Sequence, residues 1–308
     1  MNEFIMDKIE SKFGYVSVIG ATNVGKSTLL NNLIGQKISI VTRKKQTTRN
    51  KIIGIFCEKK SQVVIIDTPG IFQPKRKLDR AMVAAAWSTI NDADLIIIMF
   101  EANKTIESNT LILKHLKESR SIDKKKLICV INKIDLVRKD KLLSFMNEAR
   151  ALINSEEFFL ISALNGDGVK DLKSHLSNNI PLGVWLYPKD QITDIPYRLL
   201  ASEIVREKLM NVLHQELPYE LAVETESWNE LDDNSIRIDM LVYVNKLGQK
   251  KILIGSNGSN IKKIGTMARK EIKDMLGKNV HLFIYVKVQN NWDNNPNYFK
   301  TLGLKYNV

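Results

Sequence analysis

The sequence has little cysteine, little histidine and no long apolar run. Its 308 residues include two cysteines, Cys57 and Cys129, and both lie in apolar stretches. Buried reduced thiols are therefore expected, and no disulfide framework is implied. The longest apolar run, Leu95 to Phe100, is strand-sized and far too short to span a bilayer. A metallohydrolase is not supported, since the four histidines stand singly, at His115, His175, His214 and His281.

What the chain has in excess is positive charge. The formal net charge is +12, which indicates a polyanionic partner or, alternatively, a lysine-rich surface that only confers solubility. The position of the charge along the chain decides between these two. The length is sufficient for two domains with full cores. Acidic residues within positions 1–7 precede any apolar stretch, so no signal peptide is predicted and a cytoplasmic location is expected.

The first part of the chain alternates strand-like and helix-like segments, which is typical of a mainly parallel sheet wrapped by helices. We predict an α/β domain at residues 1–180. Strands are predicted at 15–20, 52–57, 62–67, 94–100, 127–132 and 158–162. Helices are predicted after the first loop and at 79–91, 106–117, 141–153 and 169–179. In such sheets, ligands bind at the carboxyl ends of the strands.

The pattern changes after three prolines. Pro181, Pro188 and Pro196 punctuate a stretch without a sustained period, which predicts a linker at 181–196. Residues 197–308 then form an α+β pattern. It consists of a helix at 197–215, strands at 221–227 and 236–244, an amphipathic helix after Ile254 that ends at Gly277, and a strand at 280–288.

A phosphate-binding loop follows the first predicted strand. The run from Gly20 to Ser27 fits G-x-x-x-x-G-K-[ST] and lies between a strand and a helix, which is the context that supports such a loop. Its backbone N–H groups would form a nest for phosphate oxygens. Lys26 would reach the β- and γ-phosphates, and the Ser27 hydroxyl would coordinate Mg²⁺.

Two further segments are predicted to meet the γ-phosphate and Mg²⁺. In the run 67–70, Asp67 would hold Mg²⁺ through water and the Gly70 amide would meet the γ-phosphate. The alternative is a plain turn, since Asp, Pro and Gly are turn residues, but the phosphate loop upstream favours the nucleotide role. The run 46–49 lies between the first helix and the second strand, where a mobile segment could supply a hydroxyl to Mg²⁺. We prefer Thr48 over Thr47 for that hydroxyl.

The base is predicted to be guanine. Asn132, Lys133 and Asp135 follow a predicted strand, and the Asp135 carboxylate can accept both N1–H and N2–H₂ of guanine. Adenine offers no such pair of donors, so the site would reject it by roughly four to five decades. The alkyl stem of Lys133 would cover the base. Backbone groups after the last strand would contact the guanine carbonyl oxygen, from Ser162, Ala163 and Leu164.

With these five motifs in order, the chain resembles the GTPase superfamily. The resemblance implies in-line attack of water on GTP, with Mg²⁺ as cofactor. It implies catalytic roles for Lys26, Thr48, Asp67 and Gly70, and a metal site formed by Ser27, Thr48 and Asp67. The GTP-binding set is Gly20, Asn23, Val24, Gly25, Lys26, Ser27, Thr28, Asn132, Lys133, Asp135, Ser162, Ala163 and Leu164.

Two positions bear on the rate of hydrolysis. Ile71 stands where Ras-like proteins carry a water-orienting glutamine, and it cannot hydrogen-bond water, so slow intrinsic hydrolysis is expected. Asn23 is similar to the asparagine of GTPases that recruit K⁺ to the phosphates. The alternative, an asparagine that satisfies local backbone groups, stays open.

A second glycine loop, Gly255-Ser256-Asn257-Gly258, precedes the amphipathic helix of the second domain. A lone G-x-x-G is weak, and a solvated basic helix is the alternative, but basic residues flank this loop on both sides. Its glycines would let an RNA backbone approach, as in KH domains. No aromatic residue flanks it closely, so bases would face a groove lined by Ile252, Ile254 and Ile261. The predicted RNA-binding set is Ile254, Gly255, Ser256, Asn257, Gly258, Lys262, Lys263, Arg269 and Lys270.

The combination of the two domains resembles the Era-like GTPase family over nearly the whole chain. The motifs at 46–49 and 67–70 and the segments 190–194 and 265–270 carry this resemblance. It implies a type II KH domain at 197–308 that binds the 3′ end of 16S rRNA, and assistance in assembling the 30S subunit. It also implies a monomer that alternates between GTP and GDP, with peripheral association at the cytoplasmic face of the inner membrane.

Two competing functions were considered. An RNA-modifying GTPase usually needs a further catalytic domain, often with a reactive cysteine, and neither Cys57 nor Cys129 has the sequence context of one. A plain RNA-binding module with a structural nucleotide domain is disfavoured, because Lys26, Ser27 and Asp67 are intact.

Overall fold

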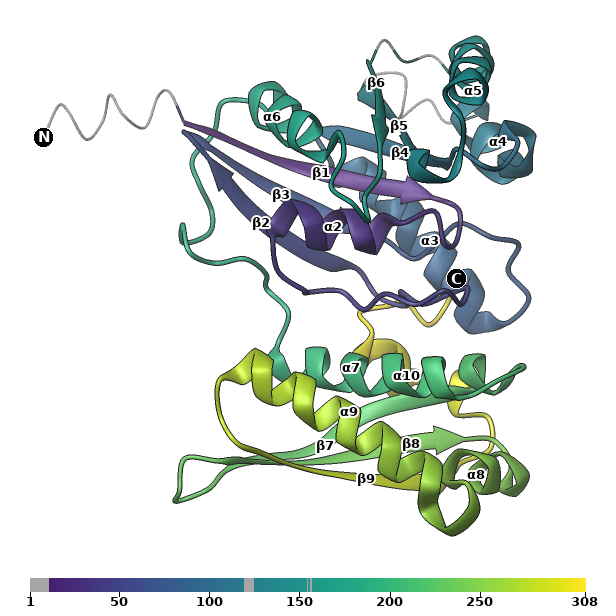
Figure 1. Cartoon of the computed structure of the whole chain (residues 1–308), viewed down its shortest axis with the longest axis vertical. Helices are drawn as coiled ribbons and strands as arrows, with labels where there is room; N and C mark the ends of the chain where they lie inside the picture. The colour runs from purple at the N-terminus through teal and green to yellow at the C-terminus, as the bar shows by residue number, and fades with distance from the viewer. Residues whose placement is uncertain (1–10, 119–124, 154, 156) are drawn as a thin grey trace, which may run out of the picture. The chain divides into compact units, whose positions relative to one another are not determined.

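The computed structural model describes residues 11–118, 125–153, 155 and 157–308. They divide into two compact units (Figure 1). The first comprises the described residues up to Ser39, together with Thr48–Asp194 and Leu302–Val308. The second comprises Ile40–Thr47 and Ile195–Thr301. The prediction made from positions 1–7 lies outside the described residues.

The first unit is built on a six-stranded sheet with the order β2-β3-β1-β4-β5-β6. All neighbouring strands are parallel except β2, which runs antiparallel to β3. The mainly parallel sheet predicted from the sequence is thus confirmed. Every residue of β4 is buried, as expected of a central strand covered by helices on both faces. The strands are β1 (Lys12–Gly20), β2 (Ile52–Glu58), β3 (Ser61–Asp67), β4 (Leu95–Glu101), β5 (Lys126–Asn132) and β6 (Glu157–Ile161).

Helices cover both faces of this sheet. On one face α2 contacts α6, and both lie in front of the sheet in Figure 1. The other face carries an apolar cluster that joins α3, α4 and α5 to strands β1, β4 and β5. The predicted helix at 106–117 begins as a 3₁₀ turn. The helices are α2 (Lys26–Ile34), α3 (Lys77–Asp92), η1 (Ile106–Asn109), α4 (Thr110–Glu118), η2 (Ile134–Leu136), α5 (Lys139–Leu152) and α6 (Val169–Asn179).

The stretch predicted as a linker packs along the first sheet. The Ile55 amide donates a hydrogen bond to the carbonyl of Ile192 at 2.8 Å, and the Thr193 hydroxyl donates to the carbonyl of Ile53 at 2.6 Å. Strand β2 is at the edge of the sheet, and these two bonds pair its backbone groups with the stretch that ends at Asp194.

The second unit has a three-stranded sheet with the order β7-β8-β9, in which β8 is antiparallel to β7 and parallel to β9. Alternate residues of the strands pack with α7 and α9 into one apolar core. This is the α+β pattern predicted from the alternation. The elements are α7 (Tyr197–Val212), η3 (Leu217–Tyr219), β7 (Leu221–Glu230), β8 (Ile236–Val244), α8 (Leu247–Ile254), η4 (Ser256–Gly258), α9 (Ser259–Leu276), β9 (Val280–Val288), η5 (Trp292–Asn294) and α10 (Pro296–Thr301).

Helix α8 was not predicted. Its eight residues bury only Leu253, so they show no apolar period that would identify a helix. The Gln249 side chain begins the helix, because its oxygen accepts the backbone N–H groups of Asn245 and Lys246, both at 2.9 Å. Such a cap satisfies two donors that no helical carbonyl can reach.

Residues Ile40–Thr47 belong to the second unit although they lie within the sequence of the first. The Val41 amide donates to a carboxylate oxygen of Glu207 on α7 at 2.9 Å. The Arg206 side chain, only 1% exposed, donates both to the carboxylate of Glu203 and to the carbonyl of Thr47. This segment is therefore held by buried charged groups of helix α7.

None of the helices in the described parts of the chain combines the length and the apolar character needed to cross a membrane.

Candidate functional site

The phosphate loop connects the end of β1 to the start of α2, as predicted. Asn23 and Gly25 have left-handed backbones, with φ of 64° and 105°. A Cβ atom on Gly25 would lie 2.2 Å from Nδ2 of Asn132, so only glycine fits there. This geometry turns the chain sharply at the N-terminus of a helix, where backbone N–H groups and the helix dipole favour an anion.

Lys26 is buried at the first position of α2, with 6% of its surface exposed. Its ammonium donates to the carbonyls of Gly20 at 3.0 Å and Ala21 at 2.9 Å. Burial lowers the pKa of Lys26 to about 8, and the nearby Asp67 carboxylate opposes this decrease. The loop thus holds a cation that is short of compensating negative charge, as a phosphate-binding site requires.

Ser27, Thr48 and Asp67 come together in space. The Ser27 hydroxyl lies 2.6 Å from Oδ2 of Asp67 and 2.9 Å from the Thr48 hydroxyl. The Thr47 hydroxyl instead bonds to Thr42, at 2.8 Å, within its own segment. The other carboxylate oxygen of Asp67, Oδ1, is buried and has no hydrogen-bond partner among the described residues.

The chemistry of this cluster fits a hard cation. Burial raises the pKa of Asp67, while the charge of Lys26 and hydrogen bonds from Ser27 and Ser39 lower it. Hydroxyl and carboxylate oxygens are the ligands that Mg²⁺ prefers, and a site that also uses substrate phosphates needs few protein carboxylates. No group of three or more His, Cys, Asp or Glu side chains suited to a metal occurs among the described residues.

The segment after β3 approaches the phosphate loop closely. A Cβ atom on Gly70 would lie 2.7 Å from Cα of Thr22, so glycine is required there. The Ile71 amide donates to the carbonyl of Gly20 at 3.0 Å. The Ile71 side chain is 5% exposed and packs in the apolar cluster beneath α3, so it is turned away from water.

The predicted base site combines three loops. Asn132 donates to the carbonyl of Val24 at 2.7 Å and accepts from the Ala163 amide at 2.9 Å, so its side chain ties two of these loops together. Asp135 lies exposed in the short helix η2. Leu164 is 77% exposed, whereas Ser162 and Ala163 are buried.

Glu101 is a functional candidate that the sequence did not indicate. It accepts an ion pair from Lys133 at 2.8 Å, and Lys104 also pairs with it. Although its burial acts to raise the pKa of Glu101, hydrogen bonds from Lys104 and Lys133 lower it below the ordinary value. Glu101 fixes the direction of the lysine expected to cover the base. The sequence signal that could have identified Glu101 is its position directly after the predicted strand 94–100.

The second glycine loop lies at the N-terminus of the long helix α9. Gly255, Asn257 and Gly258 have positive φ values of 77°, 49° and 76°. Ser256 and Asn257 are exposed, and a Cβ atom on Gly258 would meet nothing closer than 3.9 Å. The loop is therefore open at Gly258, where glycine permits the backbone conformation, whereas a Cβ atom on Gly255 would lie 2.9 Å from the Ser259 hydroxyl oxygen.

Basic side chains extend from this loop along α9. Four of them are exposed, namely Lys262, Lys263, Arg269 and Lys270. Ile252 is 60% exposed on α8, while Ile254 of the same helix and Ile261 of α9 are half-buried. The structure thus places the loop members of the predicted RNA-binding set, with Lys262 and Lys263, at the N-terminus of α9, and places Arg269 and Lys270 further along the same helix.

Neither cysteine resembles a catalytic nucleophile. Cys129 is completely buried in strand β5, and burial raises its pKa to about 12, which opposes thiolate formation. Cys57 lies half-buried in β2, where its sulfur accepts a weak hydrogen bond from Gln62 at 3.7 Å.

Two family models match the chain. The model described as a 50S ribosome-binding GTPase matches residues 15–133, and the KH domain model matches residues 216–293.

Relatives match almost the entire chain. GTPase Era of Brucella suis biovar 1 (strain 1330) is 49% identical over 96% of this chain and 94% of its own length. GTPase Era of Rhizobium meliloti (strain 1021) is 48% identical over 97% and 94% of the two chains. A crystal structure of Era in complex with MgGDPNP and nucleotides 1506–1542 of 16S ribosomal RNA matches with 36% identity and a TM-score of 0.90, over 96% of this chain and 99% of that chain. A structure of Aquifex aeolicus Era bound to GDP·AlF₄⁻ matches with 37% identity and a TM-score of 0.89, over 95% and 99%. The chain belongs to the GTPase Era family.

Proposed function

We propose that this GTPase binds and hydrolyses GTP with Mg²⁺, binds 16S rRNA near its 3′ end through the loop 255–258, and assists assembly of the 30S subunit. The observation that carries the proposal is the presence of a complete guanine-nucleotide site and an open, basic glycine loop in one chain. The solved Era complex with MgGDPNP and 16S ribosomal RNA supports it. The proposed boundaries are a GTPase domain at 1–180, a linker at 181–196 and a KH domain at 197–308.

The nucleotide site acts by positioning and charge. Lys26 balances the charge of the β- and γ-phosphates, and Asp135 selects guanine. Ser27, Thr48 and Asp67 hold Mg²⁺, which neutralises charge that develops on the phosphate oxygens. The close approach of Gly70 to Thr22 supports a contact between the Gly70 amide and the γ-phosphate. The buried Ile71 cannot orient the attacking water, so the unassisted rate is slow.

A monovalent cation is the proposed substitute for the missing water-orienting group. Asn23 lies in the sharp turn of the loop, beside the positions that the phosphates would occupy. Its amide oxygen can ligate K⁺ at that point. Turnover measured in potassium and in sodium buffers tests this role, and equal rates in the two would exclude it.

The RNA site combines a helix N-terminus with surface cations. The backbone of 255–258 lets phosphates approach the N-terminus of α9, where the helix dipole favours negative charge. A KH loop of this kind holds about four nucleotides, and the exposed lysines and arginine of α9 continue the positive surface beyond it.

The two activities are coupled in this proposal through the segment 40–49. Thr48 meets Ser27 at the metal cluster, and the adjacent Thr47 is held by Arg206 of α7. Contact with the γ-phosphate and Mg²⁺ would move Thr48, and this movement acts directly on a segment packed against the helix of the RNA-binding unit. Segments 37–49 and 71–82 are the proposed moving parts.

Crosslinking in cells, followed by sequencing of the bound RNA, tests the proposal most broadly. Reads should concentrate at the 3′ end of 16S rRNA and should be lost in the Gly258→Asp variant. A distribution over unrelated RNAs that Gly258→Asp does not change would contradict it. A cytoplasmic location, a monomeric state and peripheral membrane association remain separate predictions, which cell fractionation and sedimentation can check.

A further inference from the structure

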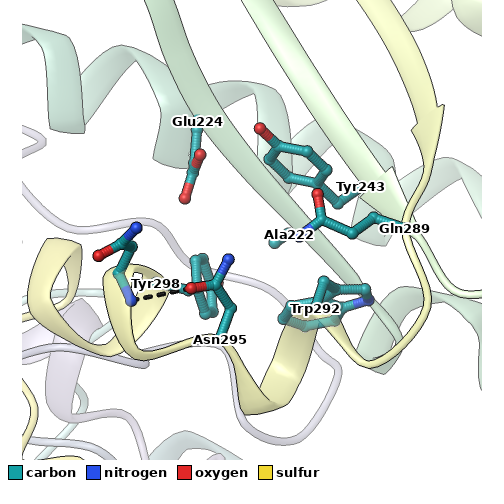
Figure 2. A pocket seen from close by; sticks show the side chains of 8 residues that line it. Ala222, Glu224, Tyr243, Gln289, Trp292, Asn295 and Tyr298 are labelled. Carbon is teal, nitrogen blue, oxygen red and sulfur yellow. Dashed lines mark hydrogen bonds between the residues drawn. The ribbon is translucent and has the colours of Figure 1, made fainter.

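A cavity of about 180 Å³ lies on the second unit, away from the glycine loop in sequence. Strands β7 and β8 contribute Glu224 and Tyr243 to its wall, and the chain after β9 contributes Gln289, Trp292, Asn295 and Tyr298. Figure 2 shows the strand residues on one side of the cavity and Trp292, Asn295 and Tyr298 on the other. Parts of the chain that are distant in sequence therefore build one site.

The lining combines aromatic rings, amides and one carboxylate. Trp292 and Tyr298 pack edge to face, with ring centroids 5.1 Å apart, and the Trp292 indole donates to the carbonyl of Glu220 at 3.3 Å. The Asn295 side chain accepts the Asn297 amide at 2.9 Å, which begins helix α10 (Figure 2). These contacts hold the wall rigid. The residues recorded as lining the cavity include no Lys, Arg or His.

Glu224 is the only ionisable acid in this wall. It is half-buried. Burial raises the pKa of Glu224, and the nearby Tyr243 hydroxyl partly opposes this increase. A cation placed in the cavity would compensate a carboxylate that has lost part of its hydration.

The surrounding sequence is acidic in a chain that is otherwise basic. Residues 209–236 contain no Lys or Arg, but they contain the acidic residues Glu216, Glu220, Glu224, Glu226, Glu230, Asp232 and Asp233. Two of these are already engaged, Glu220 with Gln249 and Glu230 with Lys278. The other five add negative charge to this stretch, and the Arg198 side chain donates to the carbonyl of Glu226 at 3.3 Å.

We propose that this cavity binds an arginine side chain presented by a basic segment of a partner protein. A guanidinium is planar and can stack on the half-buried Tyr243 while it donates two hydrogen bonds to Glu224. Its remaining N–H groups suit the amide oxygens of Gln289 and Asn295. A lysine ammonium would form fewer of these contacts, because it is neither planar nor bidentate.

The charge distribution favours a basic protein over RNA at this site. An unpaired base could also stack here, but its phosphates would lie against the carboxylates of 209–236. The basic residues of the second unit concentrate instead at 246–278, which carries nine Lys or Arg (Lys246, Lys250, Lys251, Lys262, Lys263, Arg269, Lys270, Lys273, Lys278) and two acidic residues (Glu271, Asp274). The unit thus separates a surface for polyanions from a site for a cation. This inference goes beyond the proposed RNA binding and does not depend on it.

The test uses the full chain labelled with 5-fluorotryptophan, which gives one ¹⁹F signal for each of its four tryptophans. The probes are the peptide acetyl-Gly-Gly-Arg-Gly-Gly-amide and the same peptide with citrulline, which has the shape of arginine but no charge. The arginine peptide should move the Trp292 signal and bind about tenfold more tightly than the citrulline peptide. Glu224→Gln should weaken this binding about tenfold. Glu226→Gln removes the same charge from an exposed position on the same strand and should leave the binding nearly unchanged.

Three results would overturn the proposal. These are equal binding of the two peptides, a Trp292 signal that the arginine peptide does not move, and equal effects of the two substitutions. Oligocytidylate RNA that moves the Trp292 signal, in the Gly258→Asp variant as well, would assign the cavity to a nucleobase instead. Circular dichroism of Glu224→Gln checks that the variant is folded. RNA retention by Glu224→Gln, measured in parallel, reports on the proposed function separately.

Discussion

The two glycine loops of this chain lie in opposite surroundings, although we propose the same task for both, which is to bring backbone N–H groups to phosphate. In the loop 20–27, Lys26 is buried and a Cβ on Gly25 would collide with Asn132. In the loop 255–258, the central residues are exposed and Gly258 has open space around it. In the enclosed first loop a substitution at Gly25 would collide with a neighbour, and burial lowers the pKa of Lys26. Exposure makes the second loop depend on screened surface charge. The predictions below test this difference.

The largest effect is expected at the guanine-selecting carboxylate. Asp135→Asn presents an amide donor where guanine N1–H needs an acceptor, so preference should pass from GTP to xanthosine triphosphate. The change in relative affinity should reach about 10⁴, because a bound base would cover residue 135 and the wrong base would leave its polar groups unpaired. Competition of the two nucleotides for the purified variant measures it. Unaltered GTP affinity would contradict the assignment.

Crowding at the nucleotide loop predicts the next effect. Gly70→Ala would place Cβ against the backbone of Thr22, and the resulting displacement should reduce GTP turnover about a hundredfold. Gly248→Ala is the matched control, since Gly248 has no neighbour within 4 Å and should leave turnover unchanged. Similar rates for the two variants would show that the close approach at Gly70 does not matter.

The open loop should respond to charge rather than to crowding. Gly258→Asp places a carboxylate where phosphate approaches, so RNA affinity should fall about tenfold or more while GTP turnover stays intact. Gly248→Asp introduces the same charge ten positions earlier, in the same basic segment, and should weaken RNA binding much less. Equal losses of RNA affinity in the two variants would show that the loop acts only through its net charge and makes no specific contact with RNA.

Enclosure also predicts a proton linkage at Lys26. Its pKa of about 8 in the folded, nucleotide-free chain lies below the ordinary 10.5. Between these values the unfolded chain holds the proton and the folded chain does not, so the contribution of Lys26 to stability rises with pH in that window. Phosphates favour the protonated form, so nucleotide binding at pH 8.5 should take up a proton at Lys26. At pH 7 Lys26 is already protonated, and this uptake should vanish. Calorimetry in buffers of different ionisation enthalpy measures the difference.

The smallest effect concerns a single surface cation. Lys270→Ala should weaken RNA binding only a few-fold and reduce the slope of log affinity against log salt by about 0.7, the value for one phosphate of a single strand. Lys300→Ala, an exposed lysine on α10 outside the basic segment 246–278, should leave the slope unchanged. A slope that neither substitution alters would mean that Lys270 contacts no phosphate.

The enclosed site could be predicted from sequence because its groups follow strand ends at fixed spacing. The run 20–27, Asp67 and Asp135 required only local patterns and the rule that ligands lie at the carboxyl ends of strands. Asn132 lies in the same motif, but its bonds to Val24 and Ala163 join three separate loops and have no local signal. The pairing of Lys133 with Glu101 was hidden for the same reason.

In the second unit, the segments whose apolar residues do not recur at a regular spacing were not predicted. Strands β8 and β9 and helix α9 were predicted because their apolar residues alternate or recur at helical spacing. Helix α8 buries one residue and begins at the Gln249 cap. In the sequence alone, a glutamine at this position does not distinguish a helix start from a turn. The membership of 40–47 in this unit depends on buried bonds to Arg206 and Glu207, which only the folded chain reveals.

The most direct test of the account is competition for a fluorescent guanosine diphosphate analogue bound to the purified chain. GTP should displace the analogue at a concentration about 10⁴ times lower than ATP, because Asp135 can pair only with the donors of guanine. Displacement by ATP at the same concentration as GTP would contradict the account, since the enclosed site would then have no base specificity.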